Sequence, residues 1–191
     1  MFKSENDDII DEHAMIVEVK ENKMEETTNT IYPEQKDRMY QLLQKQMEGL
    51  LDAESHWLAA LSNAAALLKN ALQDVNWAGF YLMNQGSLLL GPFQGNMACI
   101  RIQLGSGVCG SAAQQDETLV VENVHEFEGH IPCDCASNSE IVIPIHSKGS
   151  VIGVLDIDSP VFNRFDEEDR LGLTEFARIL ENKIDFDRII G

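Results

Sequence analysis

Apolar residues recur at helical spacing in two consecutive segments after Pro33. The two sets are Tyr40, Leu43, Met47, Leu50 and Leu51, followed by Leu58, Leu61, Ala65, Leu68 and Leu72. Intervals of three or four residues place such side chains on one side of an α-helix. The pattern predicts two amphipathic helices whose apolar stripes face a core, and it leaves open a homodimer that uses part of a stripe.

Beyond residue 75 the apolar residues gather in short runs that are typical of β-strands. The runs Val75–Leu82 and Ser87–Phe93 flank turn-forming residues at 84–86, so they predict a hairpin. Residues 98–103 and Thr118–Val121 are two further short runs, and each predicts a strand.

A second hairpin is predicted further along the chain. The apolar run Ile141–Ile145 is followed by a glycine-containing turn at 147–150 and then by Val151–Asp158. Successive side chains of a strand point to opposite faces, so Asp156 and Asp158 point to the same side.

Three carboxylates are therefore expected in one neighbourhood, because the turn folds Asp156 and Asp158 back toward Glu140 at the start of the first strand. Like charges held close resist simultaneous ionisation, so at least one of these acids is a candidate for a raised pKa and for proton donation. The alternative is that the two aspartates merely end a strand on its solvent-exposed face.

Two more helices complete the pattern. A glycine-rich turn leads into a short helix over Leu104–Ala113, whose first backbone amides are a candidate anion site. Asp166 caps a closing helix that reaches Asp185. Hairpins dominate the connections, which predicts a single α+β domain with a mainly antiparallel central sheet flanked by helices on one face.

Residues 1–32 contain nine acids and three lysines, a net charge of −6, and only short apolar clusters. They predict an acidic N-terminal extension, disordered or loosely docked, over residues 1–34, with the folded domain over 35–191.

The net charge of −18 without a basic stripe excludes nucleic acid as a partner. No run approaches the roughly 20 apolar residues of a membrane helix, and no signal peptide begins the chain, so a soluble, cytoplasmic protein without a membrane partner is expected.

Four cysteines carry the candidate chemistry, as free thiols, catalytic groups or metal ligands. Cys109 lies at a helix start, where a thiolate is stabilised, so it is a candidate low-pKa thiol, and Cys133 is a candidate exposed one. Zinc held by Cys133 and Cys135 with His130 and His125 is the rival. The Cys-x-Cys spacing is tighter than in zinc knuckles and lacks a second pair, so no metal and no cofactor is predicted.

Four stretches of the sequence match one known pattern, in which Cys99, Cys109, Cys133, a tryptophan and the three acids fall in the same order and spacing. They are Trp77–Leu82, Gly91–Cys99, Gly105–Gly110 and His130–Pro160. Together they resemble the free methionine-(R)-sulfoxide reductases built on a GAF domain, and the resemblance covers about residues 35–185. It implies a GAF-like fold and a metal-free enzyme that reduces the R epimer of free methionine sulfoxide and is recycled by thioredoxin.

The resemblance also implies roles for the cysteines. By motif position Cys133 is the attacking cysteine, Cys99 the main resolving cysteine and Cys109 a secondary one. This sequence departs from the pattern at Cys135, where a small residue such as alanine is expected. Cys135 is either inert or a competing resolving thiol, which leaves the disulfide pairing open.

Glu140, Asp156 and Asp158 match the family's substrate-site acids, and Trp77 and Tyr81 match its aromatic wall. A thiolate attacks a sulfoxide sulfur as the oxygen is protonated, so Glu140 or Asp158 is expected as the catalytic acid, and the ionised carboxylates as partners of the substrate ammonium. A non-catalytic GAF module that senses a small molecule is the alternative function.

Overall fold

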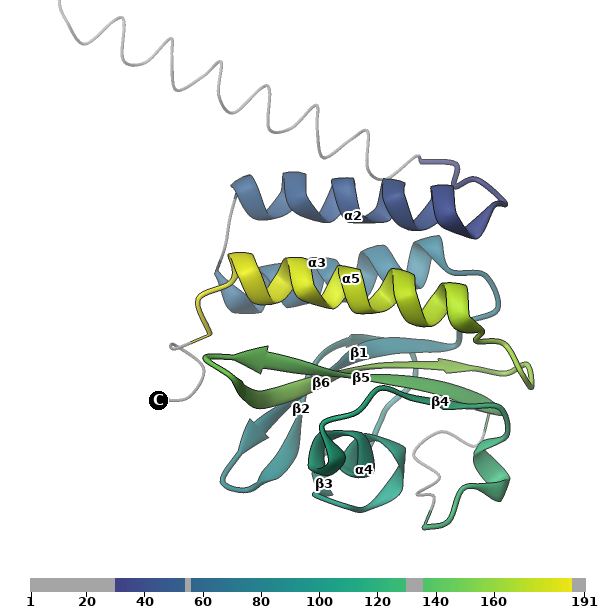
Figure 1. Cartoon of the computed structure of the whole chain (residues 1–191), viewed down its shortest axis with the longest axis vertical. Coiled ribbons are helices and arrows are strands. Elements are labelled where there is room, and N and C mark those ends of the chain that lie inside the picture. Colours follow the sequence, from purple (N-terminus) through teal and green to yellow (C-terminus); the bar gives the residue numbers. More distant parts are fainter. Residues whose placement is uncertain (1–29, 54–55, 130–135, 187–191) are drawn as a thin grey trace, which may run out of the picture. The chain divides into compact units, whose positions relative to one another are not determined.

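The structure is a computed structural model that describes residues 30–53, 56–129 and 136–186 (Figure 1). The chain divides into two units, Met1–Tyr32 and Pro33–Gly191. All helices and strands named below belong to the second unit, and the acidic extension over residues 1–34 stays a prediction. The elements are α2 (Lys36–Ala53), α3 (Trp57–Ala71), β1 (Trp77–Asn84), β2 (Ser87–Gln94), β3 (Arg101–Gln103), α4 (Gly107–Gln115), β4 (Leu119–Val121), η1 (Val124–Glu126), β5 (Ser139–Ser147), β6 (Ser150–Ser159) and α5 (Glu167–Lys183).

A six-stranded sheet with the order β3-β2-β1-β6-β5-β4 forms the centre of this unit. Every neighbouring pair in it is antiparallel, and β1–β2 and β5–β6 are the two predicted hairpins. The pairing of β1 with β6 joins these hairpins into one sheet. The predicted α+β fold with a mainly antiparallel sheet is confirmed.

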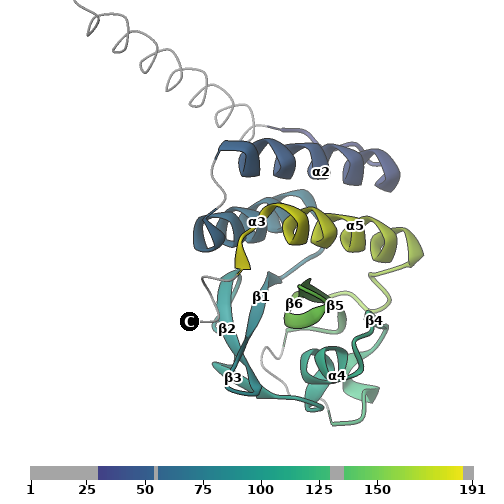
Figure 2. The same cartoon turned by 60° about the vertical axis from the view of Figure 1, so that its left-hand side comes forward.

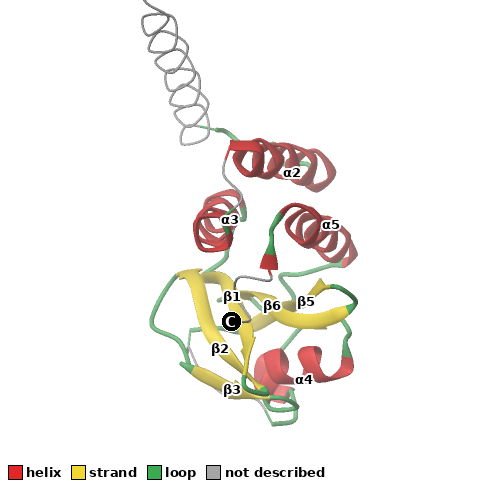
Figure 3. Cartoon of the chain, turned by 90° about the vertical axis from the view of Figure 1, so that its left-hand side faces the viewer, coloured by secondary structure: helices red, strands yellow, loops and turns green. Residues whose placement is uncertain are grey.

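The helices lie on both faces of the sheet. The helix α3 packs on β1 and β2, α5 packs on β5, and α2 lies over α3 and α5 (Figures 1 and 2). The short helix α4 contacts β3, β4, β5 and β6 from the opposite side (Figure 3). The expectation that the helices gather on one face is therefore correct for the three long helices and wrong for α4.

The two amphipathic stripes are confirmed as core, with one exception. Of the apolar residues that predicted α2 and α3, Leu50 is half-buried and Leu58 is 48% exposed, while the others are buried. Leu58 lies in the first turn of α3, where it lines a shallow hollow together with residues of β1 and β2. A homodimer through these helices stays a prediction.

The predicted third strand over 98–103 is shorter in the structure. Only Arg101–Gln103 pairs with β2, whereas Ala98 and Cys99 lie outside any regular element. The Cys99 carbonyl accepts a hydrogen bond from the Tyr81 hydroxyl, and the Asn96 carbonyl just before the stretch accepts one from Trp77, so side chains hold this part of the backbone. Among the described helices, none is long and apolar enough to cross a membrane.

A buried carboxylate, Asp169, ties α2 to the start of α5. Its side chain is fully buried and accepts hydrogen bonds from Tyr40 Oη at 2.7 Å, Lys36 Nζ at 2.5 Å and Arg164 at 3.1 Å. It also accepts the backbone amide of Asp166, whose own carboxylate accepts the Asp169 amide, so the pair forms a capping box. Burial, with the adjacent Asp169 charge and hydrogen bond, raises the pKa of Tyr40 well above its ordinary value.

We expect Asp169→Asn to lower the free energy of unfolding by about 3–5 kcal/mol, because the variant leaves Lys36 and Arg164 facing a neutral amide in a buried site. Urea denaturation at pH 7 measures the change. Glu168→Gln, one position away and exposed, is the matched control and should stay within about 0.5 kcal/mol of the wild type. A loss of the same size in both variants would contradict this role of Asp169.

Candidate active site

The register of three central strands brings the predicted site residues onto one face of the sheet. Trp77 pairs with Asp158, and Gly79 pairs with Asp156 across β1 and β6. Across β5 and β6, Glu140 pairs with Asp158. Residues directly opposite each other in a sheet share a face, so the aromatic residues of β1 and the three acids of the hairpin face the same side. That side is the one covered by α4.

Cys109 of α4 meets two of these acids in a buried cluster. Its Sγ lies 3.8 Å from Glu140 Oε1, and one ligand atom each of Cys109, Glu140 and Asp156 lies within 4.8 Å of the others. Glu140 is 7% exposed and Asp156 is 6% exposed. The alternative that the aspartates merely end a strand in solvent is therefore wrong for Asp156.

Burial controls the protonation of these acids. It raises the pKa of Glu140 well above its usual range, and the charges of Asp156 and Asp158 raise it further. Burial also raises the pKa of Asp156 to about 6, although hydrogen bonds with Cys109 and Glu140 lower it. Of the two acids, Glu140 therefore holds its proton more strongly, and Asp156 is the one that ionises first.

One oxygen of Asp156 lacks a partner. Among the described residues, no donor reaches its buried Oδ1. An unpartnered buried carboxylate oxygen is costly, and a positively charged donor from a bound molecule would satisfy it.

The thiol of Cys109 differs from its prediction. Complete burial raises the pKa of Cys109 well above its ordinary value, and Asp156 and Glu140 raise it further. The expectation of a low-pKa thiol is therefore wrong, because desolvation and adjacent carboxyl groups outweigh the position near the helix start. Cys109 is a neutral thiol in this state, and the structure gives it no disulfide.

The predicted anion site before α4 is also smaller than expected. The amide of Gly105 donates to the Gly110 carbonyl, that of Ser106 to Gln103 and that of Gly107 to Gly129. These three amides are therefore already paired within the backbone, and the expectation of open amides is wrong for them.

The aromatic wall of β1 contains a third ring that the sequence analysis missed. Trp77 stacks on Tyr81 with ring centroids 6.0 Å apart and on Phe93 of β2 at 5.3 Å. Gly79 makes this possible, because a Cβ there would lie 2.4 Å from Phe93 Cβ and 2.7 Å from Trp77 Cη2. A glycine between two aromatic residues of a strand was the available signal of such a close approach.

The wall also holds the backbone around Cys99. The Tyr81 hydroxyl donates to the Cys99 carbonyl at 3.0 Å, and Trp77 Nε1 donates to the Asn96 carbonyl at 3.2 Å. Cys99 is half-buried and disulfide-bonded, and its partner lies outside the described residues. The two aromatic side chains thus fix the backbone around a disulfide-bonded cysteine as well as lying on the face of the acid cluster.

Three predicted residues, Cys133, Cys135 and His130, lie outside the described residues. His125 Nε2 lies 2.9 Å from Asn138 Oδ1, within hydrogen-bonding distance.

Cys109, Glu140 and Asp156 offer a sulfur and two carboxyl groups of the kinds that bind divalent metals. Metal binding needs these groups deprotonated, but the pKa of each of the three is raised, which favours the protonated form.

Comparison with known proteins identifies the family. The GAF domain model matches residues 46–184. The free methionine-R-sulfoxide reductase of Escherichia coli is 51% identical over 146 residues, which cover 76% of this chain and 88% of that protein. The chain belongs to this family of GAF-domain enzymes.

Solved structures agree with this membership. The fRMsr of Staphylococcus aureus in its reduced form is 49% identical, with a TM-score of 0.74 over 76% of this chain and 95% of the other. The free methionine-R-sulfoxide reductase of Neisseria meningitidis in complex with its substrate is 42% identical, with a TM-score of 0.79 over 84% of this chain and 96% of the other. The resemblance found in the sequence is confirmed.

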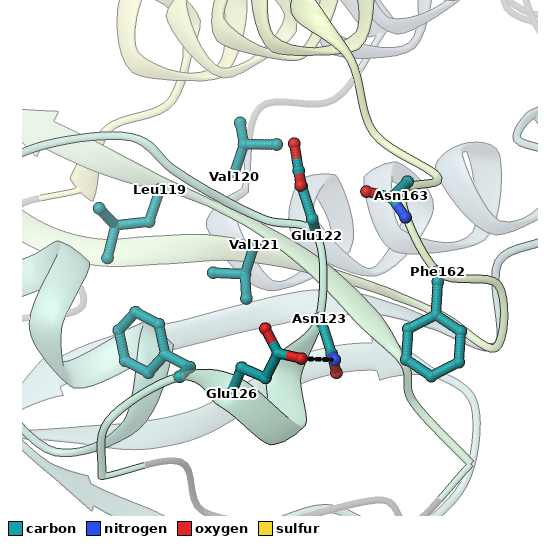
Figure 4. A pocket seen from close by; sticks show the side chains of 9 residues that line it. Leu119, Val120, Val121, Glu122, Asn123, Glu126, Phe162 and Asn163 are labelled. Atoms are coloured by element: carbon teal, nitrogen blue, oxygen red, sulfur yellow. Dashed lines mark hydrogen bonds between the residues drawn. The ribbon is translucent and has the colours of Figure 1, made fainter.

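Two hollows on the enzyme surface contain none of the acids of the cluster in their lining. One, of about 670 Å³, is lined by the edge strand β4 with Glu126, Phe162 and Asn163 (Figure 4). The other, of about 420 Å³, lies between the start of α3 and the strands β1 and β2. Neither is lined by a predicted site residue, so size alone does not locate the chemistry.

We expect Asp156→Asn to stabilise the enzyme at pH 8 by about 2–3 kcal/mol, since a shift of about two pKa units corresponds to about that free energy. Below about pH 4 the Asp156 carboxyl group is protonated in both the folded and the unfolded wild type, so the variant is not expected to be more stable there. Between about pH 4 and 6 the unfolded state loses the proton first, so wild-type stability falls as the pH rises, and the variant lacks this loss.

Urea denaturation of the reduced proteins across this pH range measures the effect. The exposed Glu117→Gln is the control and should show no such trend. An Asp156→Asn advantage that stays constant from pH 4 to pH 8 would contradict the raised pKa of Asp156.

Proposed function

We propose that this enzyme reduces free L-methionine-(R)-sulfoxide to methionine with a cysteine nucleophile, and that thioredoxin recycles it in the cytoplasm. Relatives that share about half of the residues carry the name of this activity. The observation that carries the proposal is the neutral, buried carboxyl group of Glu140 on the same face as an aromatic wall.

Glu140 is the proton donor in this mechanism. A sulfoxide oxygen leaves only as it is protonated, and an ordinary glutamate is ionised at neutral pH. The raised pKa of Glu140 keeps the proton available, and its burial keeps competing water away. Asp158, which pairs with Glu140 across the strands and raises its pKa, supports this state.

Asp156 and Asp158 hold the substrate ammonium. Asp156 Oδ1 is buried and has no donor among the described residues, and an ammonium group donates three hydrogen bonds with the complementary charge. Trp77 and Tyr81, which are 2% and 1% exposed, supply the apolar surface for the methyl-thioether part of the substrate once it is bound. A protein-bound methionine sulfoxide lacks the free ammonium, so this arrangement selects the free amino acid.

The covalent steps use two cysteines. The Cys133 thiolate attacks the sulfoxide sulfur while Glu140 gives its proton to the sulfoxide oxygen. The oxygen is transferred to Cys133, so the products are free methionine and a Cys133 sulfenic acid. The Cys99 thiol then attacks this sulfur and releases water, which leaves a Cys99–Cys133 disulfide. The disulfide-bonded state of Cys99 and the unpaired state of Cys109 support this assignment over a resolving role for Cys109.

A dithiol protein closes the cycle. Reduction of the disulfide needs two electrons and two protons, which thioredoxin supplies from its own thiol pair. A reducing compartment such as the cytoplasm maintains that pair. Cys109 is a secondary resolving thiol, which can react with the Cys133 sulfenic acid when Cys99 does not. Cys135 either competes for the same sulfenic acid or takes no part.

The stereospecific test supplies free R and S epimers with dithiothreitol and measures methionine. We expect turnover with the R epimer and about two thiols lost per chain when the reductant is left out. A sensing module without catalysis would lose no thiols and release no methionine.

Cys133→Ser should abolish both turnover and the stoichiometric release of methionine, because a serine hydroxyl cannot replace a thiolate nucleophile. Quenched single-turnover reactions measure the release. Cys99→Ser should still release about one methionine per chain before it stalls as a sulfenic acid. Cys135→Ser is the neighbouring control, and a full burst of methionine from Cys133→Ser would refute the assignment of the nucleophile.

N-acetyl-methionine-(R)-sulfoxide should react roughly 30- to 1,000-fold more slowly than the free amino acid. It lacks the ammonium, so the buried carboxylates stay unpaired, at a cost of about 2–4 kcal/mol. The ratio of the two kcat/KM values measures the effect. Comparable values would exclude the proposed ammonium site without excluding the cysteine chemistry.

A further inference from the structure

The segment that carries Cys99, residues Asn96–Ile100 between β2 and β3, has two chemically different sides. Its inner side is fixed to the sheet through three carbonyls. That of Asn96 accepts from Trp77, that of Cys99 from Tyr81, and that of Ile100 from the Leu90 amide at 2.9 Å. We refer to residues 96–100 as the Cys99 segment.

The chain enters this segment through Gly95, which adopts a φ of +141° and lies against the indole of Trp77. A Cβ at this position would lie 2.5 Å from Trp77 Cδ1 and 2.8 Å from the Asn76 carbonyl. The backbone can therefore approach the aromatic wall closely only with glycine there. The Cys99 segment is held in one position rather than forming an open loop.

The outer side of the Cys99 segment is apolar and exposed. Met97 is 90% exposed and Ile100 is 73% exposed, and they flank the half-buried Cys99. Among the described residues only Ile31 is a more exposed large apolar side chain than these two. No charged residue lies between Asp74 and Arg101, although the chain as a whole has a net charge of −18.

A backbone that is fixed by three hydrogen bonds holds two large apolar side chains in water close in sequence to a disulfide-bonded cysteine, and their exposure has no evident role in the folded chain alone. Their exposure brings no gain in stability, and an exposed apolar pair becomes favourable when a partner covers it. The chemistry of the disulfide defines that partner, because its reduction requires a dithiol to reach one of the two sulfurs.

We propose that Met97 and Ile100 form the docking surface for the dithiol protein that reduces the Cys99 disulfide, a thioredoxin-type partner with an uncharged, apolar rim around its thiols. This inference rests on the proposed function, which requires such a reductant. Residues 75–100 contain no charged side chain, so this stretch adds no charge repulsion of its own toward a partner, although the chain as a whole is acidic.

Docking at this surface determines which sulfur is attacked. The partner's thiolate attacks Cys99 Sγ, forms a mixed disulfide with Cys99, and releases the other cysteine as a thiolate that takes up a proton. The partner's second thiol then attacks the mixed disulfide and releases Cys99 as a thiol. One protein disulfide is reduced and one partner dithiol is oxidised, so electrons and protons balance.

A double variant, Met97→Ser with Ile100→Ser, tests the docking surface with two reductants. With thioredoxin, its reductase and NADPH, we expect the KM for thioredoxin to rise about tenfold or more, because the apolar contacts are lost. With dithiothreitol, which needs access to the sulfur only, methionine formation should stay within about twofold of the wild type. Val161→Ser with Phe162→Ser, an exposed apolar pair elsewhere, is the matched control for both reductants.

The outcomes separate the two proposals. If the Met97/Ile100 variant turns over with dithiothreitol and its KM for thioredoxin is unchanged, the docking surface is overturned and the proposed function stays intact. An equal loss with both reductants would also overturn it, because the defect would lie in the chemistry. Wild-type enzyme that forms no methionine with either reductant would overturn the proposed function itself and the docking surface with it.

A thioredoxin whose second active-site cysteine is replaced by serine tests the attacked sulfur. It should accumulate as a mixed disulfide with the wild-type enzyme, and peptide mass mapping should place the bond at Cys99. Trapping at another cysteine would overturn the direction of attack. The Met97/Ile100 variant should trap about tenfold more slowly at low thioredoxin concentration.

Discussion

The burial of Glu140 and Asp156 within hydrogen-bonding reach of each other is the constraint on which the site depends. Two carboxyl groups without a buried cation cannot both ionise at low cost, so one keeps its proton at neutral pH. This division yields an acid and an ionised carboxylate from two ordinary residues. It also costs stability, since an oxygen of Asp156 is left without a donor among the described residues.

Contacts on the opposite face of the sheet stabilise the fold. There the helices α2, α3 and α5 bury their apolar stripes, and Asp169 is matched by Lys36, Arg164 and Tyr40. Both faces contain buried carboxyl groups, but within the part of the chain that the structure describes only Asp169 has cationic partners. The contrast separates a buried acid that stabilises the fold from buried acids that are kept reactive.

The aromatic wall links the two halves of the proposed cycle. Trp77 and Tyr81 lie beside the acids through the pairing of β1 with β6, and their polar atoms hold the Cys99 segment from behind. The same two side chains therefore contact the proposed substrate site and hold the backbone of the cysteine to which we assign the resolving role.

The sequence by itself determined the two hairpins, the long helices and the meeting of the three acids. Alternation along Val151–Asp158 and the short turn before it were enough to predict the hairpin and the meeting of the acids, because strand geometry is local. The family resemblance supplied the aromatic wall and the roles of the cysteines. Helical spacing identified the stripes of α2 and α3, apart from Leu58, which faces solvent.

Only the tertiary structure decided the electrostatics and the placement of α4. The pKa of Cys109 follows from total desolvation and from acids that lie more than 30 positions away in the chain, so its position near a helix start was a misleading local signal. Phe93, the bonded carbonyls of the Cys99 segment and the face chosen by α4 likewise depend on contacts between distant residues. A sequence pattern specifies which face a side chain takes, whereas packing specifies what surrounds it and hence its charge.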